Sequence, residues 1–324
     1  MPAAQMVTAI AAEAGEAAVR LREATPPSPL YRSTALSRRF GCNVLLKCEH
    51  LLPTGSFKFR GAYNRISLLT PSEAAAGVVA ASSGNHGLGI AVSARERGVP
   101  VEIHTPADAS PAKLAAIAAQ GAVLVLNDGD CLAAERSARQ AADERGAAYI
   151  SPYNDRHVIA GQGTMAVEML QQAPQLDAVV LSVGGGGMMG GVGAVLAQHS
   201  PTTELIGAWP ANATSLLRSI EHGSAIEVEE QPTISDATSG PVEPGSITIP
   251  LGMELDPTCL EVSEERIKAA MRVLAEDEHW IVEGAAGLAL AGLEAVADRL
   301  AGKTVAVVIC GRNIDFDRFM EAVA

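Results

Sequence analysis

The stretch GVVAASSGNHGLGIAVSARERGVPVEIHT, residues 77–105, decides the fold. It opens with a short run of β-branched and small residues, passes through a glycine-containing turn into an Ala-rich segment with helical spacing, and ends in a second β-branched run at residues 99–105. A strand, a helix and a second strand in this order form a βαβ unit, in which the two strands lie parallel. The stretch therefore predicts an α/β protein.

The same alternation continues on both sides of this unit. Short apolar runs predict further strands at residues 43–49, 122–127, 147–152, 177–183, 204–210 and 303–311. Ala-rich segments of helical length separate most of these runs, so we expect open, mainly parallel sheets with helices on both faces. Residues 221–260 are rich in proline, glycine and acidic side chains and predict loops with short elements.

The composition excludes several classes of protein. The 324 residues are 48% hydrophobic and 19% charged, which is enough apolar material for a sizeable core. The net charge of −13 repels nucleic acid and anionic membranes, so we expect neither as a partner. Five cysteines without a CxxC pair, and an N-terminus without the basic segment of a signal peptide, predict reduced thiols in the cytoplasm.

Two segments combine a turn, the start of a helix and reactive residue types. In PTGSFKFRGA (53–62), Lys58 stands where the helix dipole disfavours a cation, so it is either a neutral, nucleophilic amine or an exposed lysine. The segment AASSGNHGLG (80–89) places backbone N–H groups and short polar side chains at a helix start. This arrangement suits a carboxylate or a phosphate, although an ordinary capped turn explains it equally well.

Two further segments follow predicted buried strands. The segment LSVGGGGMMGG (181–191) contains four consecutive glycines, namely Gly184, Gly185, Gly186 and Gly187. We favour close approach of the backbone to an anion over close helix–sheet packing, and the nucleotide-binding Gly-Lys-Ser/Thr sequence is absent. The segment ICGRN (309–313) puts Cys310 at the ligand-facing edge of the expected sheet, although on its own a buried inert cysteine is the simpler interpretation.

In this order, the four segments resemble those of the pyridoxal-phosphate (PLP) enzymes with the tryptophan-synthase β fold, fold type II. Within that group the chain is similar to the serine/threonine dehydratase and serine racemase branch, from residue 29 to residue 313. The resemblance implies pyridoxal 5′-phosphate as the cofactor. It also implies a large cofactor-binding domain of residues 1–74 and 149–324, a small inserted α/β domain of residues 75–148, and a cofactor in the cleft between them.

The resemblance also implies roles for individual residues. Lys58 matches the Schiff-base lysine, which also removes the Cα proton, and Ser83 matches the serine that faces this lysine in the racemases. The other cofactor-binding positions match Phe57 at the ring, Asn85 at the 3′-oxygen, Gly184, Gly185, Gly186, Gly187 and Met188 at the phosphate, and Cys310 at the pyridine nitrogen. The substrate carboxylate would be held by Ser82, Ser83, Asn85 and His86.

One departure from the resemblance concerns metal binding. The metal-binding relatives carry a Glu, and an Asp six residues later, at positions that match Trp209 and Ser215. Both carboxylates are absent, so we expect no metal site here. Glu283 resembles a residue near the cofactor ring, or else it caps a helix. Residues 235–251 either line the substrate side or form a polar surface loop.

The resemblance implies β-elimination from a β-hydroxy-α-amino acid, which yields a 2-oxo acid and ammonia. A thiol opposite the pyridine nitrogen leaves it unprotonated, and we expect the weaker electron sink to favour elimination. Expected substrates are L-threonine or L-serine, or a hydroxylated diaminobutyrate from hydroxyectoine breakdown. An amino-acid racemase with Lys58 and Ser83 as opposed bases stays open, as does a non-catalytic small-molecule-binding protein with an inert Lys58. A homodimer is expected in each case.

Overall fold

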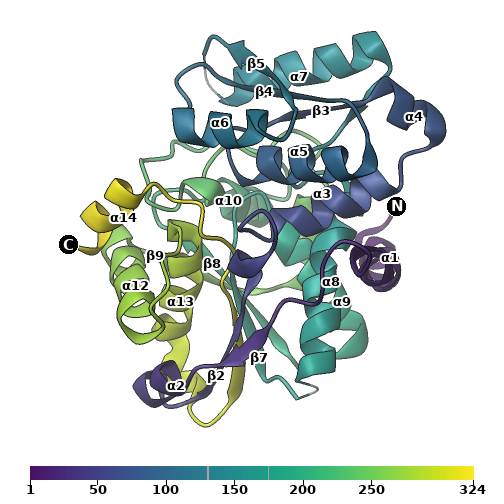
Figure 1. Cartoon of the computed structure of the whole chain (residues 1–324). Coiled ribbons are helices and arrows are strands. Elements are labelled where there is room, and N and C mark those ends of the chain that lie inside the picture. The colour runs from purple at the N-terminus through teal and green to yellow at the C-terminus, as the bar shows by residue number, and fades with distance from the viewer. Residues whose placement is uncertain (130, 174) are drawn as a thin grey trace.

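Two sheets organise the chain (Figure 1). The structure is a computed structural model and describes residues 1–129, 131–173 and 175–324. The larger sheet has the strand order β1-β2-β10-β7-β8-β9, and the smaller has the order β5-β4-β3-β6. Among the described residues, every strand pairing is parallel except that of β1 with β2. The predicted α/β fold with open, mainly parallel sheets is therefore confirmed.

The six-stranded sheet is built from both ends of the chain. Its strands are β1 (Leu30–Arg32), β2 (Asn43–Lys47), β7 (Ala178–Ser182), β8 (Glu204–Pro210), β9 (Thr258–Val262) and β10 (Thr304–Val308). In register, Ala306 of β10 lies opposite Leu45 of β2 and Val179 of β7. The inner strands are almost continuously apolar because helices cover both faces of the sheet.

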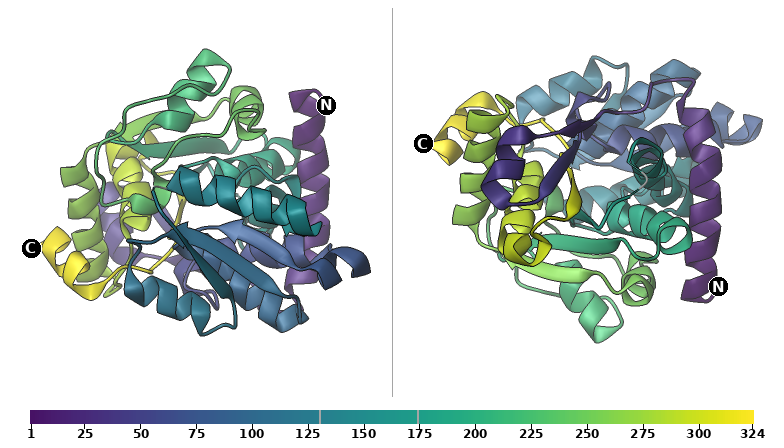
Figure 2. Two further views of the ribbon diagram at one scale, coloured as in Figure 1. Left: turned by 90° about the horizontal axis from the view of Figure 1, so that it is seen from above. Right: turned by 90° about the horizontal axis from the view of Figure 1, so that it is seen from below.

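Two groups of helices flank this sheet on opposite sides (Figure 1). One group consists of α1 (Ala3–Leu21), α8 (Arg156–Gln172) and α9 (Gly187–His199), which pack against one another. In the other group, α13 (Gly284–Val296) lies across β7, β8 and β10, beneath α12 (Glu264–Asp277). Figure 2 shows the two termini, in α1 and α14 (Phe316–Val323), on opposite sides of the molecule.

The four-stranded sheet comes from one continuous part of the chain. Its strands are β3 (Val78–Ala81), β4 (Val101–Pro106), β5 (Val123–Asn127) and β6 (Ala148–Tyr149). The helices α5 (Asn85–Arg97) and α6 (Pro111–Ala118) lie on one side, and α7 (Cys131–Arg145) lies on the other (Figure 1). Ile90, Ile103 and Ile117 belong to a core of its own, separate from the core of the larger sheet.

Shorter helices connect these layers. They are α2 (Thr34–Phe40), α3 (Lys58–Ser67), α4 (Pro71–Ala76), α10 (Ser215–His222) and α11 (Thr248–Leu255), with 3₁₀ turns η1 (Glu49–Leu51), η2 (Asp236–Thr238) and η3 (Ala297–Leu300). Helix α3 packs against both α5 and α8, and so joins the two sheets. No helix among the described residues combines the length and apolarity that a membrane span requires.

Residues 221–260 consist of loops with short elements, as predicted, and these elements include α11 and the first part of β9, which the sequence did not place individually. Because β9 is an edge strand, its side chains alternate between covered and open sides and include Glu261, so no apolar run marks it. Pro71 begins α4, where Thr70 and Glu73 form a capping box.

Candidate active site

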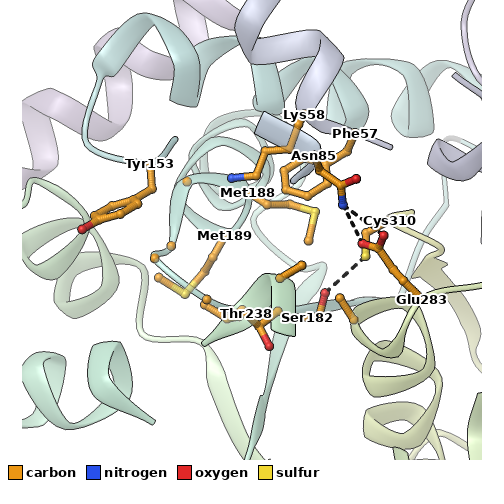
Figure 3. Close-up of a pocket in the computed structure, with 17 residues that line it drawn as sticks. Phe57, Lys58, Asn85, Tyr153, Ser182, Met188, Met189, Thr238, Glu283 and Cys310 are labelled. Atoms are coloured by element: carbon orange, nitrogen blue, oxygen red, sulfur yellow. Dashed lines mark hydrogen bonds between the residues drawn. The ribbon is translucent and has the colours of Figure 1, made fainter. Parts of the chain in front are cut away.

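A pocket opens where β7 and β10 end side by side and meet the start of α3 (Figure 3). Ligands of open α/β sheets bind outside the carboxyl ends of the strands, as here. The pocket is lined by Phe57, Lys58, Asn85, Tyr153, Ser182, Val183, Gly184, Gly185, Gly186, Gly187, Met188, Met189, Ala237, Thr238, Glu283, Ala285 and Cys310. The structure thus brings together all the residues for which the sequence predicts a cofactor-binding role.

Lys58 is the first residue of α3 and follows a turn in which Gly55 has a φ of 73°. Its Nζ donates to the carbonyl of Pro152 at 3.0 Å and lies 5.2 Å from the centre of the Phe57 ring. Burial lowers the pKa of Lys58 to about 8. A substantial neutral fraction of the amine is therefore present near physiological pH, as nucleophilic chemistry requires.

The four glycines, residues 184–187, lead from β7 into α9. Gly186 precedes α9 with a φ of 88°, a conformation that favours glycine. A Cβ on Gly185 would lie 2.4 Å from the ring of Tyr153, so a larger residue has no room there. The first turn of α9 has no side-chain cap, and its unpaired N–H groups form a cradle suited to a phosphate.

Cys310 lies at the end of β10 and is buried. The hydroxyl of Ser182 donates to its Sγ at 3.7 Å (Figure 3). Burial raises the pKa of the Cys310 thiol, so the thiol stays protonated. A neutral thiol does not supply the negative charge that would hold a proton on a pyridine nitrogen, which fits the position expected for it.

Asn85, Glu283 and Asn313 form a hydrogen-bond network beside the pocket. Asn85 Nδ2 donates to both carboxylate oxygens of Glu283, at 2.9 and 3.0 Å, and Asn85 Oδ1 accepts from Asn313 Nδ2 at 2.6 Å. The backbone N–H of Asn313 also donates to Glu283, at 3.1 Å. Burial raises the pKa of Glu283 to about 7. Although Glu283 precedes α13, its side chain makes no capping bond and instead lines the pocket.

A larger cleft of about 640 Å³ adjoins the pocket and shares Lys58, Asn85, Tyr153 and Glu283 with it. Its other polar lining includes Ser82, Ser83 and His86 at the start of α5, together with Lys113, Asp236, Ser239, Arg312, Asn313 and Asp315. Cavities of this size accommodate small molecules. The residues expected at the substrate carboxylate therefore face a space that is continuous with the pocket of Lys58.

His86 is buried beneath this cleft. Its Nε2 lies 2.9 Å from the carbonyl oxygen of Ile150 and therefore carries the proton, which leaves Nδ1 as an unpartnered acceptor. Burial lowers the pKa of His86 to about 3, assisted by the charge of Lys58. The imidazole is thus neutral at physiological pH, and the side chain fixes the start of α5 against the strand that precedes Ser151.

Some lining residues carried no signal in the sequence. Tyr153 is brought to the pocket by tertiary packing, whereas Ser182 and Met189 lie within the glycine-rich segment 181–191 and could have been recognised there. Residues 235–251, which the sequence left open, contribute Thr238 to the pocket and other residues to the cleft. This loop therefore lines both the pocket and the cleft.

Trp209 and Ser215 occupy the positions at which the metal-binding relatives carry carboxylates, and both make other contacts here. Trp209 is buried in the main core. Ser215 donates to Glu230 Oε1 through its N–H at 3.1 Å and through its hydroxyl at 2.5 Å, and Gly240 N–H donates to Glu230 Oε2 at 2.7 Å. No group of three or more His, Cys, Asp or Glu side chains in the described residues is placed to hold a metal ion. The absence of a metal requirement remains a prediction.

Comparison with known proteins identifies the family. A family model described as "Pyridoxal-phosphate dependent enzyme" matches residues 21–311. The chain is 37% identical to an L-threonine ammonia-lyase of Thermotoga maritima, over 93% of this chain and 74% of the relative, and 36% identical to an L-threo-3-hydroxyaspartate ammonia-lyase of a Pseudomonas species, over 94% and 95%.

A solved serine racemase from Dictyostelium discoideum matches the fold with a TM-score of 0.87 at 32% identity, over 94% of this chain and 99% of that one. The expected resemblance is therefore confirmed at the level of the family. The phosphate cradle, the partly neutral lysine and the neutral thiol fit the cofactor that this family uses. This chain belongs to the family of pyridoxal-phosphate dependent enzymes.

Proposed function

We propose that the chain is a PLP-dependent ammonia-lyase acting on β-hydroxy-α-amino acids. The reaction breaks the Cα–H and Cβ–OH bonds, and the water lost in this elimination is regained when hydrolysis releases ammonia and a 2-oxo acid. The observation that carries the proposal is the placement of Lys58 opposite the neutral thiol of Cys310 in one pocket. Similarity to two ammonia-lyases over more than nine-tenths of the chain supports it.

The pocket would hold the cofactor through residues of both sheets. The glycine loop, residues 184–187, would bind its phosphate, Phe57 would pack on its ring and Cys310 would face its pyridine nitrogen. Asn85 Nδ2 donates to both carboxylate oxygens of Glu283, and the same amide group would bind the 3′-oxygen of the cofactor. When bound, the cofactor supplies an electron sink for the charge that develops at the substrate Cα.

Lys58 would accept the proton of the substrate Cα and pass it on as the hydroxyl group leaves Cβ as water. A pKa of about 8 suits a group that must both accept and release a proton near neutral pH. The carbonyl of Pro152 accepts a hydrogen bond from Nζ and so keeps the amine beside the pocket. The hydroxyls of Ser82 and Ser83 and the N–H groups at the start of α5 would bind the substrate carboxylate.

The substrate class is part of the proposal. L-Threonine, L-serine, threo-3-hydroxyaspartate and a hydroxylated diaminobutyrate from hydroxyectoine breakdown share the β-hydroxyl and differ in side-chain charge. The cleft carries both signs of charge, on Lys113 and Arg312 and on Asp236 and Asp315, so its polarity accommodates any of them. A racemase is the second candidate, because Ser83 lines the same cleft as Lys58 and because of the similarity to a serine racemase.

The test measures three products from this panel of amino acids: 2-oxo acid, ammonia and the opposite enantiomer. We expect at least one member to release 2-oxo acid and ammonia in equal amounts, and the release to vanish in Lys58→Ala. Ser83→Ala should reduce racemisation much more than elimination, because Ser83 helps to bind the substrate carboxylate in both reactions but would act as a base only in racemisation. Enantiomer formation without 2-oxo acid, from protein that carries its cofactor, would overturn the lyase proposal in favour of the racemase.

The domain division, the oligomer and the compartment are further parts of the proposal. Residues 75–148 would move as a small domain over bound substrate, which is supported by their separate core and tested by substrate-dependent hydrogen exchange. Exposed Tyr31 and Ile281 beside Trp280 support a homodimer, tested by light scattering. The buried thiols of Cys42 and Cys48 form no disulfide, which supports a reducing cytoplasm.

A further inference from the structure

Residues 235–247, here called the strap, link the two sheets beside the cleft. Two acidic side chains of the strap bind cations on helices of the four-stranded sheet. Asp236 pairs with Lys113 of α6 at 3.2 Å, and Glu243 pairs with Arg139 of α7. At its other contacts the strap is held by the larger part of the molecule, because Gly240 donates to Glu230 and Ile247 donates to Asn154.

Of the two pairs, the one between Glu243 and Arg139 is the better protected. The Glu243 side chain is only 13% exposed, so water screens its charge less than it screens that of Asp236, which is 41% exposed. Arg139 is fixed in turn by Glu135 at 2.9 Å and by the ring of Tyr149, whose centre lies 4.2 Å from the guanidinium carbon. Through Arg139, α7 therefore holds one carboxylate oxygen of Glu243, and the hydroxyl of Ser151 donates to the other at 3.4 Å.

Glu243 also contacts the wall of the pocket. Its backbone N–H donates to the hydroxyl of Tyr153 at 3.0 Å. The ring of Tyr153 packs so closely on the glycine loop that a Cβ on Gly185 would lie 2.4 Å from it. In Figure 3 the hydroxyl of Tyr153 points away from Lys58, so this phenol does not face the reacting atoms. Burial raises the pKa of Tyr153, so the hydroxyl stays protonated.

These contacts form one continuous chain from α7 to the phosphate cradle. We propose that Glu243 is a positioning residue: held by Arg139, it places Tyr153 against residues 184–187 and thereby sets how tightly the cofactor phosphate is bound. The proposal rests on the proposed placement of the phosphate in the glycine loop, and it is independent of which amino acid is the substrate. The affinity for the cofactor then depends on the position of α7, the helix of the four-stranded sheet that carries Arg139.

A double-mutant cycle on cofactor affinity tests this coupling. The dissociation constant of pyridoxal phosphate is measured by titrating apo-protein for wild type, Arg139→Gln, Tyr153→Phe and the double variant. Each single change removes one hydrogen-bonded link, and we expect it to raise the dissociation constant about 3- to 10-fold. Because both changes break the same chain, the double variant should be no weaker than the weaker single variant.

Arg145 offers a matched control on the same helix. It pairs with Glu102 at 2.7 Å within the four-stranded sheet and makes no contact with the strap. Arg145→Gln should leave cofactor affinity unchanged within about twofold, alone or combined with Tyr153→Phe. Thermal unfolding of each variant checks that it is folded. If the effects of Arg139→Gln and Tyr153→Phe multiply fully, or if Arg145→Gln matches Arg139→Gln, the coupling is refuted.

A further variant separates failure of the coupling from failure of the proposed phosphate site. Gly185→Ala introduces a Cβ at the ring of Tyr153 and should weaken cofactor binding at least about tenfold, since the loop must shift. Unchanged affinity in Gly185→Ala would refute the placement of the phosphate itself. Weakened affinity in Gly185→Ala together with an additive cycle would refute only the role of Glu243.

Discussion

Lys58 and Arg60 stand two residues apart in the same helix, but Arg60 is fully buried, whereas Lys58 is partly buried and lines the pocket. All three nitrogens of the Arg60 guanidinium are bonded, to Glu49, Glu168, Thr164 and Ser28 at 2.6–3.0 Å. The Lys58 amine has one hydrogen bond, to a backbone carbonyl. A buried cation with a complete set of partners stabilises the fold, whereas one left with few partners loses its proton easily and becomes reactive.

The largest expected effect separates activity from stability at Lys58. Replacing the amine in Lys58→Met removes the proton acceptor, so release of 2-oxo acid should fall by at least about 10³-fold. The same change removes a poorly solvated amine, and the free energy of unfolding of the apo-protein should stay within about 1 kcal/mol of wild type. Stopped assays and urea titrations measure the two. A large loss of stability would mean that Lys58 is structural after all.

Arg60→Met should give the reverse result. It leaves the carboxylates of Glu49 and Glu168 buried without their main cation, so we expect the free energy of unfolding to fall by about 3–5 kcal/mol. Arg38→Met, on the exposed surface of α2, is the control and should change it by less than about 0.5 kcal/mol. Equal stability of Arg60→Met and Arg38→Met in denaturant titrations would remove the contrast between the two clusters.

Glu283 is a buried acid, and its effect on stability can be tested through the pH dependence of unfolding. Its pKa is raised from 4.5 to about 7, so the folded apo-protein binds a proton more tightly than the unfolded chain. The resulting stabilisation is complete below about pH 4.5 and is lost as the pH rises through about 7, in total about 3 kcal/mol. Glu283→Gln should lack this component when unfolding free energies are compared across that range. Parallel curves for the two proteins would contradict the buried, protonated carboxyl.

A smaller effect concerns cofactor uptake by the apo-protein. Because the pKa of Lys58 is about 8, the neutral amine increases severalfold between pH 7 and 9. The rate at which added pyridoxal phosphate becomes covalently attached should therefore rise up to about tenfold over this interval, then level off. Rapid mixing with absorbance detection measures the rate. A rise that continues to pH 10.5 would show a lysine with an ordinary pKa.

The smallest expected effect concerns a further set of hydrogen bonds, formed by Glu230 with Ser215 and Gly240. Ser215 and Gly240 already satisfy this carboxylate, so no cation is needed to hold the loop that lines the cleft. Because no cation is expected in this loop, incubation with a chelator should change the rate of 2-oxo acid release by less than about twofold. This is a smaller effect than the loss of a single hydrogen bond would have. Loss of activity on chelation, restored by magnesium or manganese, would contradict the expected absence of a metal site.

The sequence predicted the short local segments of the site better than the contacts between distant segments that surround them. Lys58, Asn85, residues 184–187 and Cys310 each lie in a strand–turn–helix segment or at a strand end, where geometry is encoded within a few residues. Parallel sheets bring such ends to one edge, so their convergence was predictable. Arg60 lies near Lys58 in sequence, but its ion-pair partner Glu168 comes from a distant segment, which no local pattern indicates.

The remaining features depend on contacts that no local pattern reveals. Glu283 precedes α13 as a capping residue would, and only the approach of Asn85 from the other sheet turns its carboxyl into the pocket. Strand β9 was missed because one side of an edge strand is left uncovered. Tyr153 and the strap owe their positions to packing between distant segments, which also explains why the polar sequence 235–251 left its own role undecided.

The strand order of the smaller sheet has an evolutionary consequence. The first and last strands of that sheet, β3 and β6, are neighbours, so the chain enters and leaves it through one narrow passage. A segment whose ends already meet can be exchanged for another with little added loop-closure entropy and without altering the order of the larger sheet. Replacement of this segment would therefore change the cleft wall at Ser82 and Ser83 without disturbing the strand order that places Cys310.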